Sequence, residues 1–280
     1  MLICTTPTEM HSACRDLHAS ANTLGLVPTM GALHAGHLSL FATARAECHI
    51  VAASIFVNPI QFSPGEDYES YPRTLDEDCR KLESAGVQIL FAPSAAGMFP
   101  PGNTTFVDPG EIATRLDGAS RPGHFRGVAT IVTRLFNVVA PDRAYFGQKD
   151  AAQVAVLRHI VRDLNLPVHI AVCPIVREPD GLALSSRNIY LSPAERSQAL
   201  ALNRAIRNVV ELTTASERRA ATLIQAARET IAVEPAIRVD YVALVNSATL
   251  EPLEVATPGA LFAVAVWVGP TRLIDNTILN

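Results

Sequence analysis

The chain has 280 residues, a formal net charge of −4 and an apolar fraction of 49%. A typical domain holds roughly 100 to 200 residues, so this length predicts one large or two modest domains. The net charge provides no basic field for nucleic acid, and we expect no nucleic-acid partner. No apolar run reaches the ~18 to 20 residues that a membrane-spanning helix needs, and no basic segment precedes an apolar one at the N-terminus. We therefore expect a cytoplasmic protein without a membrane partner.

Cysteine and lysine usage adds two expectations. The five cysteines are scattered and never form a Cys-x-x-Cys pattern, which predicts buried, reduced thiols. Of the 23 basic residues, only Lys81 and Lys149 are lysines. A compact ammonium and a planar guanidinium differ in shape and in the geometry of their donors, so a chain that prefers arginine can retain lysine where arginine cannot replace it. Lys149 is a candidate for function on this ground, with chance retention as the alternative.

The first strong motif follows a predicted helix over 10–21 and a short apolar strand over 24–27. Its residues, 28–40, read as a sharp turn that enters a helix ending near Glu47. Two histidines, His34 and His37, fall in or beside the first helical turn. Their spacing places both on one helical face.

These histidines predict a phosphate site. Gly36 between them lacks a Cβ and allows close approach of a ligand to the backbone. The first amides of a helix have no intrahelical partner and carry the positive end of its dipole, so an anion there meets free donors as well as two imidazoles. Polar decoration of a helix start is one alternative. A zinc site is another, but no nearby Cys or acidic residue supplies a third ligand.

A second candidate segment follows an apolar, β-branched run over 49–57, which predicts a buried parallel strand. Ligands of open α/β sheets bind beyond the carboxyl ends of the strands. Asn58 and Gln61 lie there and offer amides suited to a small hydroxylated or carboxylated substrate. On the simpler interpretation, Asn-Pro only ends the strand. The polar segment 63–71 predicts a mobile flap.

The middle of the chain predicts further elements of the same sheet: a helix up to Ala85, a strand over 87–91 and a helix over 128–139. A basic segment, 121–127, precedes the last helix, and a solvated loop is the alternative to a functional role for it. The sequence assigns no individual role to its polar side chains, which are Arg121, His124 and Arg126.

A short strand over 144–146 then delivers Gly147, Gln148, Lys149 and Asp150 to the start of a helix that runs to about Leu164. This arrangement repeats the strand, turn and helix of the histidine motif. Gly147 allows backbone approach, and a lysine at such a turn can follow a phosphate oxygen as charge grows on it.

After a strand over 168–172, Asp180 and Gly181 predict a hairpin turn. The hairpin leads to Ser185, Ser186 and Arg187, whose two hydroxyls and guanidinium suit a triphosphate. An ordinary polar hairpin exit is the alternative.

The character of the chain changes from Ser192, where a proline and a capping-box glutamate start a helix. Helices over 193–212 and 216–233 are followed by strands over 240–245, 261–268 and 272–274. The sequence thus predicts an α/β domain over 1–176 and a smaller α+β domain over 177–280.

Five of these segments resemble one known family. The run Pro28-Thr29-Met30-Gly31-Ala32-Leu33-His34-Ala35-Gly36-His37-Leu38 contains the His-x-Gly-His signature of nucleotidyltransferases and resembles the pantothenate synthetase (pantoate–β-alanine ligase) family. The other matches are 56–62, 146–150 and 180–188. The last of these has Leu184 where the family has Met, and 121–127 is similar to a stretch that borders the family's active cleft.

The resemblance implies a Rossmann-like doubly wound parallel sheet, with the C-terminal domain covering the active-site cleft. It implies ATP-dependent condensation of pantoate with β-alanine through a pantoyl adenylate, with release of AMP and pyrophosphate. His34, His37 and Lys149 would be catalytic, and Gln61 and Gln153, with Asn58 beside them, would contact the substrate.

The same resemblance implies a large set of ATP contacts: Met30, Gly31, Ala32, Leu33, His34, Ala35, Gly36, His37, Gly147, Gln148, Lys149, Asp150, Val176, Leu184, Ser185, Ser186 and Arg187. Magnesium should bridge the phosphates, with Asp150 as a candidate ligand. A homodimer is implied as well. Ala151 and Ala152 replace larger residues of the family, so the pocket wall near Gln153 is expected to be looser.

Two other functions fit the His-x-Gly-His motif. A nucleotidylyltransferase would transfer the nucleotide to another small acid or a phosphorylated substrate and stop there. A catalytically silent nucleotide sensor would bind ATP without turnover.

Overall fold

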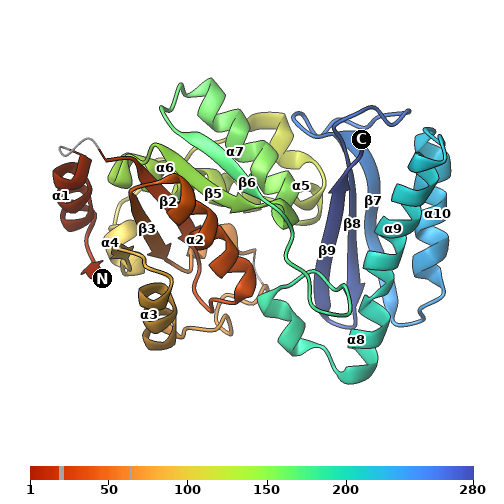
Figure 1. Cartoon of the computed structure of the whole chain (residues 1–280), viewed down its shortest axis with the longest axis horizontal. Helices are drawn as coiled ribbons and strands as arrows, with labels where there is room; N and C mark the ends of the chain where they lie inside the picture. Colours follow the sequence, from red (N-terminus) through yellow and green to blue (C-terminus); the bar gives the residue numbers. More distant parts are fainter. Residues whose placement is uncertain (19–21, 64) are drawn as a thin grey trace. The chain divides into compact units, whose positions relative to one another are not determined.

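The computed structural model describes residues 1–18, 22–63 and 65–280, which form two compact units (Figure 1). The first unit comprises Met1–Gly147 and Val156–Cys173, and the second comprises Gln148–Ala155 and Pro174–Asn280. The expected boundary at residue 176 lies close to Pro174. The segment 148–155 groups with the second unit, whereas the sequence-based division assigns it to the first domain.

The first unit is built on a six-stranded parallel sheet with the order β1-β4-β3-β2-β5-β6. Its strands are β1 (Leu2–Cys4), β2 (Leu24–Thr29), β3 (Ile50–Ile55), β4 (Ile89–Phe91), β5 (Arg143–Gly147) and β6 (His169–Cys173). The chain moves outward from β2 to β4 and then returns to the other side of β2 with β5. This order confirms the doubly wound α/β class, and the switch point of the sheet lies between β2 and β5.

Helices cover the sheet because its strands are apolar on both faces. Helix α2 (Ala35–Glu47) packs against β2, β3 and β5, and its side chains Phe41 and Ala44 are fully buried. The other elements of this unit are α1 (Pro7–His18), η1 (Pro59–Gln61), α3 (Leu75–Ser84), α4 (Ala95–Met98), η2 (Gly110–Thr114), α5 (Asp117–Ser120) and α6 (His124–Val139). Helix α7 (Ala151–Asp163) begins in the second unit and ends in the first.

Strand β2 extends through Pro28 to Thr29, beyond the expected end at Val27. Proline lacks an N–H, so it is tolerated in a strand only where no ladder bond is required. The β2 ladder with β3 reaches Thr29, but the β2 ladder with β5 contains only Gly25 and Leu26. Pro28 therefore lies where one side of the strand has already lost its partner.

The second unit contains a three-stranded antiparallel sheet with the order β7-β8-β9. Its elements are η3 (Gln148–Asp150), η4 (Ser186–Tyr190), α8 (Pro193–Ala199), α9 (Ala201–Thr214), α10 (Ala220–Ala232), β7 (Ile237–Asn246), β8 (Ala260–Val268) and β9 (Thr271–Ile278). This is the smaller α+β part that the sequence predicts. Ser192 and Glu195 form the predicted capping box of α8.

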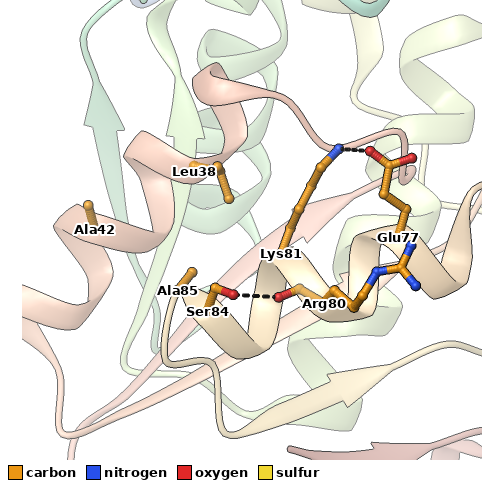
Figure 2. A pocket seen from close by; sticks show the side chains of 7 residues that line it. All are labelled: Leu38, Ala42, Glu77, Arg80, Lys81, Ser84 and Ala85. Atoms are coloured by element: carbon orange, nitrogen blue, oxygen red, sulfur yellow. Dashed lines mark hydrogen bonds and ion pairs between the residues drawn. The ribbon is translucent and has the colours of Figure 1, made fainter.

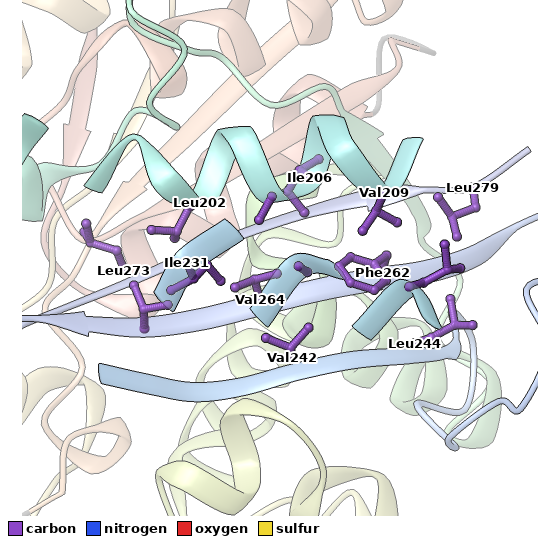
Figure 3. Packing of buried hydrophobic residues seen from close by; sticks show 14 of the residues in the cluster. Leu202, Ile206, Val209, Ile231, Val242, Leu244, Phe262, Val264, Leu273 and Leu279 are labelled. Carbon is purple, nitrogen blue, oxygen red and sulfur yellow. The ribbon is translucent and has the colours of Figure 1, made fainter. Parts of the chain in front are cut away.

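The core of the second unit lies between the sheet and its helices, where apolar side chains of α9 and α10 meet those of the strands. Figure 3 shows this packing for Leu202, Ile206, Val209, Ile231, Val242, Leu244, Phe262, Val264, Leu273 and Leu279. Phe262 and Val264 are fully buried. Burial of each such side chain contributes about 1.5 to 3 kcal/mol, so β8 is the best-anchored strand of this sheet.

Several predicted element bounds are wrong. Strand β1 was not expected, and the helix expected over 193–212 is interrupted at Leu200. The next helix begins at Ala220 rather than near residue 216, because Ser216 adopts a left-handed φ of 74° and Arg219 forms a bridge with Val255. The strands of the second unit are also longer than predicted, since the alternating pattern weakens at their polar ends.

The start of α6 changes the setting of the basic segment. Gly123 has a φ of 85°, which favours glycine, and it lets the helix begin at His124. His124 and Arg126 are therefore helical, so the helix begins before its expected start near residue 128, and the alternative of a solvated loop does not hold for residues 124–127.

Two predictions reach residues outside the described ranges. The helix expected over 10–21 is found as α1 up to His18, and residues 19–21 lie outside the description. The expected flap over 63–71 includes residue 64, which is likewise outside it. All five cysteines are free; Cys79 is partly exposed and the others are buried. Within the described ranges, no helix is both long and apolar enough to span a membrane.

Candidate active site

The histidine turn joins β2 to α2 at the carboxyl end of the parallel sheet. The hydroxyl of Thr29, the last residue of β2, donates to the Ser54 carbonyl at 2.8 Å and accepts the N–H of Gly31 at 3.2 Å. Gly31 and Ala32 then take positive φ values of 85° and 50°, which reverse the chain. A side chain at Gly31 would be strained, since that conformation favours glycine.

His34 and His37 cap α2 reciprocally. The Nδ1 atom of His34 accepts the N–H of Gly36 at 3.2 Å, and the Nδ1 atom of His37 accepts the N–H of His34 at 3.3 Å. A ring nitrogen that accepts carries no proton, so each imidazole is neutral with its proton on Nε2. The ring centroids lie 4.1 Å apart. The turn thus brings the two imidazole rings close together.

A carboxylate of α3 holds this turn, and no motif in the sequence pointed to it. Asp78 is fully buried and accepts the N–H of Ala32 at 2.9 Å and that of Leu33 at 2.8 Å. The Thr74 hydroxyl donates to the same carboxylate at 3.1 Å. Hydrogen bonds to a charged group are worth about 1.5 to 3 kcal/mol each, so Asp78 is a principal support of the turn.

Lys81 supports the same turn from the next helical turn of α3. Its ammonium donates to the Leu33 carbonyl at 2.7 Å and pairs with Glu77 at 2.7 Å. Both lysines of the chain therefore lie at candidate segments, although the composition singled out only Lys149. Figure 2 shows the Lys81–Glu77 pair beside a cavity of about 480 Å³ between α2 and α3. The cavity is lined by Leu38, Ala42, Glu77, Arg80, Lys81, Ser84 and Ala85, so it lies beside the histidine turn without including it.

The segment after β3 places the two predicted amides together. Asn58 is buried, and its Nδ2 donates to Gln61 Oε1 at 2.9 Å and to the Gly127 carbonyl at 3.1 Å. Gln61 Nε2 in turn lies 3.1 Å from the sulfur of Met30. Asn58 therefore orients Gln61, and its own contact with a substrate stays a prediction. Gln61 lies beside the beginning of the histidine turn.

The basic segment connects to Gln61 through a chain of hydrogen bonds. Arg121 forms two bonds of 2.6 Å with the Glu66 carboxylate and lies 3.0 Å from His124 Nε2. His124 Nδ1 lies 2.9 Å from the Gln61 carbonyl. Because the carbonyl only accepts, Nδ1 carries the proton and Nε2 accepts from Arg121.

The pKa values agree with this arrangement. Burial lowers the pKa of His124 to about 4, and the charge of Arg121 acts in the same direction. Burial alone would raise the pKa of Glu66, but the hydrogen bonds and charge of Arg121 outweigh it and lower that pKa. At neutral pH this series of hydrogen bonds therefore joins the Glu66 carboxylate, the Arg121 guanidinium and the neutral His124 imidazole.

The backbone of Gly127 lies very close to the backbone of Ile60 and Gln61. A Cβ at Gly127 would lie 2.4 Å from the Ile60 carbonyl oxygen and 2.6 Å from Gln61 Cα, so only glycine fits there. Beside it lies a cavity of about 190 Å³. Arg126 borders this cavity and stacks over Phe106 at 4.2 Å from the ring centroid.

In the second unit, η3 carries Lys149. Its ammonium lies 3.5 Å from the Asp150 carboxylate, which is about half exposed. Gln148 Nε2 donates to Asn276 Oδ1 at 2.9 Å, and the Asn276 amide donates to the carbonyls of Gln148 and Lys149. Gln153 follows on α7 and is partly exposed, whereas Ala151 and Ala152 are buried in the second unit.

The predicted hairpin is present, but its arms pair through a single bridge between Arg177 and Ala183. Gly181 has a φ of 95° at the turn, and the N–H of Leu184 donates to the Val176 carbonyl at 2.9 Å. The Ser185 hydroxyl then accepts the N–H of Arg187 and begins η4. The Ser-Ser-Arg triplet is therefore held in a defined turn.

The candidate residues fall into two groups. The first unit holds Met30, Gly31, Ala32, Leu33, His34, Ala35, Gly36, His37, Asn58, Gln61 and Gly147; the second holds Gln148, Lys149, Asp150, Gln153, Val176, Leu184, Ser185, Ser186 and Arg187. Within the first unit, β3, β2 and β5 are neighbours and end at the same edge of the sheet. The segment of Asn58 and Gln61 follows β3, the histidine turn follows β2, and Gly147 is the last residue of β5. All three lie near the switch point, where open α/β sheets bind ligands.

Comparisons with known proteins agree with this arrangement. A family model described as pantoate-beta-alanine ligase matches residues 2–278. A pantothenate synthetase from Koribacter versatilis is 52% identical over 280 residues, covering 100% of this chain and 96% of the relative. One from Thermotoga neapolitana is also 52% identical and covers 100% of both chains.

Solved structures give the same result. A crystal structure of pantothenate synthetase from Thermus thermophilus has a TM-score of 0.93 at 46% identity, covering 99% of both chains. A pantoate-beta-alanine ligase from Francisella tularensis, crystallised with beta-gamma ATP and β-alanine, has a TM-score of 0.82 at 35% identity, covering 99% of this chain and 97% of that one. With the histidine turn at the switch point of the sheet, these full-length matches show that the chain belongs to the pantoate-beta-alanine ligase family of enzymes.

Proposed function

We propose that this enzyme joins pantoate to β-alanine through a pantoyl adenylate, consuming ATP and releasing AMP and pyrophosphate. The observation that carries the proposal is the position of the histidine turn, with its two neutral imidazoles, beside Gly147 at the switch point of the sheet. The Francisella tularensis relative was crystallised with beta-gamma ATP and β-alanine, which supports the same two substrates here.

In the first step, a carboxylate oxygen of pantoate attacks the α-phosphorus of ATP and pyrophosphate leaves. Negative charge grows on the phosphoryl oxygens, and preorganised donors stabilise it. His34 and His37 supply Nε2–H groups, and Lys149 supplies a mobile ammonium that follows the shifting charge. We assign the remaining ATP contacts to the backbone of the histidine turn, to Gln148 and Asp150, and to the hairpin segment, which comprises Val176, Leu184, Ser185, Ser186 and Arg187.

In the second step, the amine of β-alanine attacks the carbonyl carbon of the adenylate. The new C–N bond forms as the bond from the carbonyl carbon to the AMP oxygen breaks, and the amine loses a proton. A free carboxylate would resist this attack, whereas AMP is a good leaving group. The activated acid must therefore be held until the amine arrives.

We assign the orientation of pantoate to Gln61, with Gln153 as a second contact. Asn58 fixes the side-chain oxygen of Gln61, and His124 fixes its backbone carbonyl. Glu66 and Arg121 hold His124 in turn. Arg121 and His124, to which the sequence assigned no role, would thus act by positioning Gln61.

Magnesium fits the residues present. Magnesium usually binds substrate phosphates with one or two protein carboxylates, and the half-exposed Asp150 beside Lys149 suits such a ligand. When bound, the ion neutralises phosphate charge. The described residues contain no cluster of three or more His, Cys, Asp or Glu side chains that could form a protein cage for a metal.

On the sequence resemblance we further propose a homodimer that acts in the cytoplasm, where ATP is available. Neither step requires nucleic acid or a membrane. The net charge of −4 agrees with small anionic substrates being bound by local donors rather than by a general basic field.

A two-stage assay tests the proposal. Pantoate alone should support exchange of labelled pyrophosphate into ATP, and adding β-alanine should then release AMP and pantothenate in equal amounts. A nucleotidylyltransferase for another substrate would show no dependence of AMP release on β-alanine. A nucleotide sensor would show neither exchange nor turnover, and either result would refute the proposed function.

A further inference from the structure

The turn that carries Lys149 is held by a residue far along the chain, at the C-terminal strand. Asn276 of β9 uses its Nδ2 group to donate to the Gln148 carbonyl at 3.0 Å and to the Lys149 carbonyl at 2.9 Å. Its Oδ1 accepts from Gln148 Nε2 at 2.9 Å. All three contacts lie within the second unit.

These contacts require an amide side chain. Two donors on one nitrogen and an acceptor on the neighbouring oxygen are present together only in Asn and Gln, and here all of them are used. Asn276 is 4% exposed, so water does not replace a lost contact easily. The bonds fix the carbonyl of Lys149 itself, and with it the direction in which the lysine side chain leaves the backbone.

The preceding residue anchors the other ATP-binding segment of this unit. Asp275 accepts two bonds from Arg177, at 2.7 and 2.9 Å, and Arg177 also donates to the Gly181 carbonyl at the hairpin turn. Successive side chains leave a strand on opposite faces, so one strand can hold two separate segments. Asp275 is 2% exposed. Strand β9 therefore holds both η3 and the hairpin that leads to Ser185.

We propose that Asn276 is a positioning residue for the activation step and acts through Lys149. The inference rests on the proposed function, because it assumes that the Lys149 ammonium stabilises the phosphoryl charge. The long lysine side chain is 23% exposed and has a carboxylate neighbour only at 3.5 Å, so the position of its backbone sets where the ammonium can reach. A displacement of ~1 Å in such a group can cost about 100-fold in rate.

Substitution of Asn276 should leave the sheet intact, because the backbone of residue 276 remains paired with Ala263 in the β8–β9 ladder. Asn276→Ala should lower the rate of pantoate-dependent ATP–pyrophosphate exchange by about 10- to 100-fold. Asn276→Asp keeps the side-chain volume but turns a carboxylate oxygen toward two carbonyls, so its loss should be at least as large. This second variant tests the donors even if the alanine variant does not fold.

A double-substitution cycle separates positioning from general stability. If Asn276 acts through Lys149, Asn276→Ala should cost less than about threefold in a Lys149→Ala background. Equal losses in the two backgrounds, or no loss in the parent enzyme, would overturn the proposal.

Asp240→Asn is the matched control, because Asp240 also links to β9, by a 2.9 Å bond with Arg272, whereas the carbonyls of η3 are held by Asn276. Its exchange rate should stay within about twofold of the parent, as expected for a contact away from the reacting groups; a loss like that of Asn276→Ala would show that any loosening of the sheet has this effect. Absence of exchange in the parent enzyme would overturn the proposed function itself. That result differs from equal losses in the two backgrounds, which would overturn only the role of Asn276.

Discussion

Replacing Asp78 with asparagine tests how the histidine turn is built. The carboxylate is fully buried and accepts the N–H groups of Ala32 and Leu33, one on each oxygen. Asparagine has the same shape, but its NH₂ group cannot accept. Whichever way the amide is turned, one backbone N–H loses its partner and faces a donor.

The magnitude follows from these contacts. Loss of a hydrogen bond to a charged group costs about 1.5 to 3 kcal/mol, so the turn should be destabilised by about 1.5 to 3 kcal/mol. Gly31 and Ala32 hold left-handed conformations that the turn must maintain. If the turn relaxes by ~1 Å, the imidazole of His34 moves with it, and the rate should fall by about 100-fold.

Two measurements check this reasoning. Pantoate-dependent ATP–pyrophosphate exchange should fall in Asp78→Asn, and the amides of Ala32 and Leu33 should exchange with deuterium more quickly than in the parent enzyme. Asp76→Asn is the control, since Asp76 is an exposed carboxylate of the same helical turn. Unchanged activity and unchanged amide protection in Asp78→Asn would show that the carboxylate does not hold the turn.

The remaining predictions concern other parts of the site. His37→Ala and Lys149→Ala should each lower the exchange rate by about 100- to 1000-fold while leaving the fold intact; near-normal exchange would refute their roles. Folding lowers the pKa of His124 from 6.5 to about 4, so its contribution to stability is complete above pH 6.5 and is lost as the unfolded chain takes up a proton at lower pH. The loss should reach about 3 kcal/mol at pH 4 and be absent in His124→Gln, as measured by urea unfolding; equal acid sensitivity of both proteins would contradict this. Gly127→Ala places a Cβ 2.6 Å from Gln61 Cα and should lower kcat/KM for pantoate by about 100-fold in initial-rate assays. Unchanged kinetics would show that the backbone at Gln61 moves aside without displacing its side chain.

The local motifs could be predicted because their chemistry is contained in a few neighbouring residues. The spacing of His34 and His37, with Gly36 between them, predicts a helix start that presents two imidazoles, and the structure confirms the helix start and the close pair of rings. The strands that precede each candidate segment were also recognisable, since buried parallel strands read as apolar runs.

The supports of these motifs could not be predicted in the same way. Asp78 is one of three acidic residues at the start of α3, and nothing in their order shows that only this one is buried under the turn. Asn276 lies more than a hundred residues from the carbonyls that it holds. Such contacts depend on the register of β9 and on which elements pack together, and neither leaves a periodic signal in the sequence.

The ends of some helices and strands were predicted wrongly for a similar reason. Leu200 interrupts two helices without a glycine or proline to mark the break, and Pro28 extends a strand that its type would ordinarily end. In both cases the outcome is set by neighbouring elements rather than by the residue itself. The sequence therefore predicted the fold class and the local turns better than it predicted the lengths of the elements.

The fate of the pantoate carboxylate oxygens tests the central claim most directly. If pantoate is activated as an adenylate, heavy oxygen placed in its carboxylate should appear in AMP after turnover, because the bond that breaks lies between the carbonyl carbon and the bridging oxygen. Mass spectrometry of the products would detect it. Label that is found in inorganic phosphate, with ADP as the nucleotide product, would show activation through an acyl phosphate and would contradict the account.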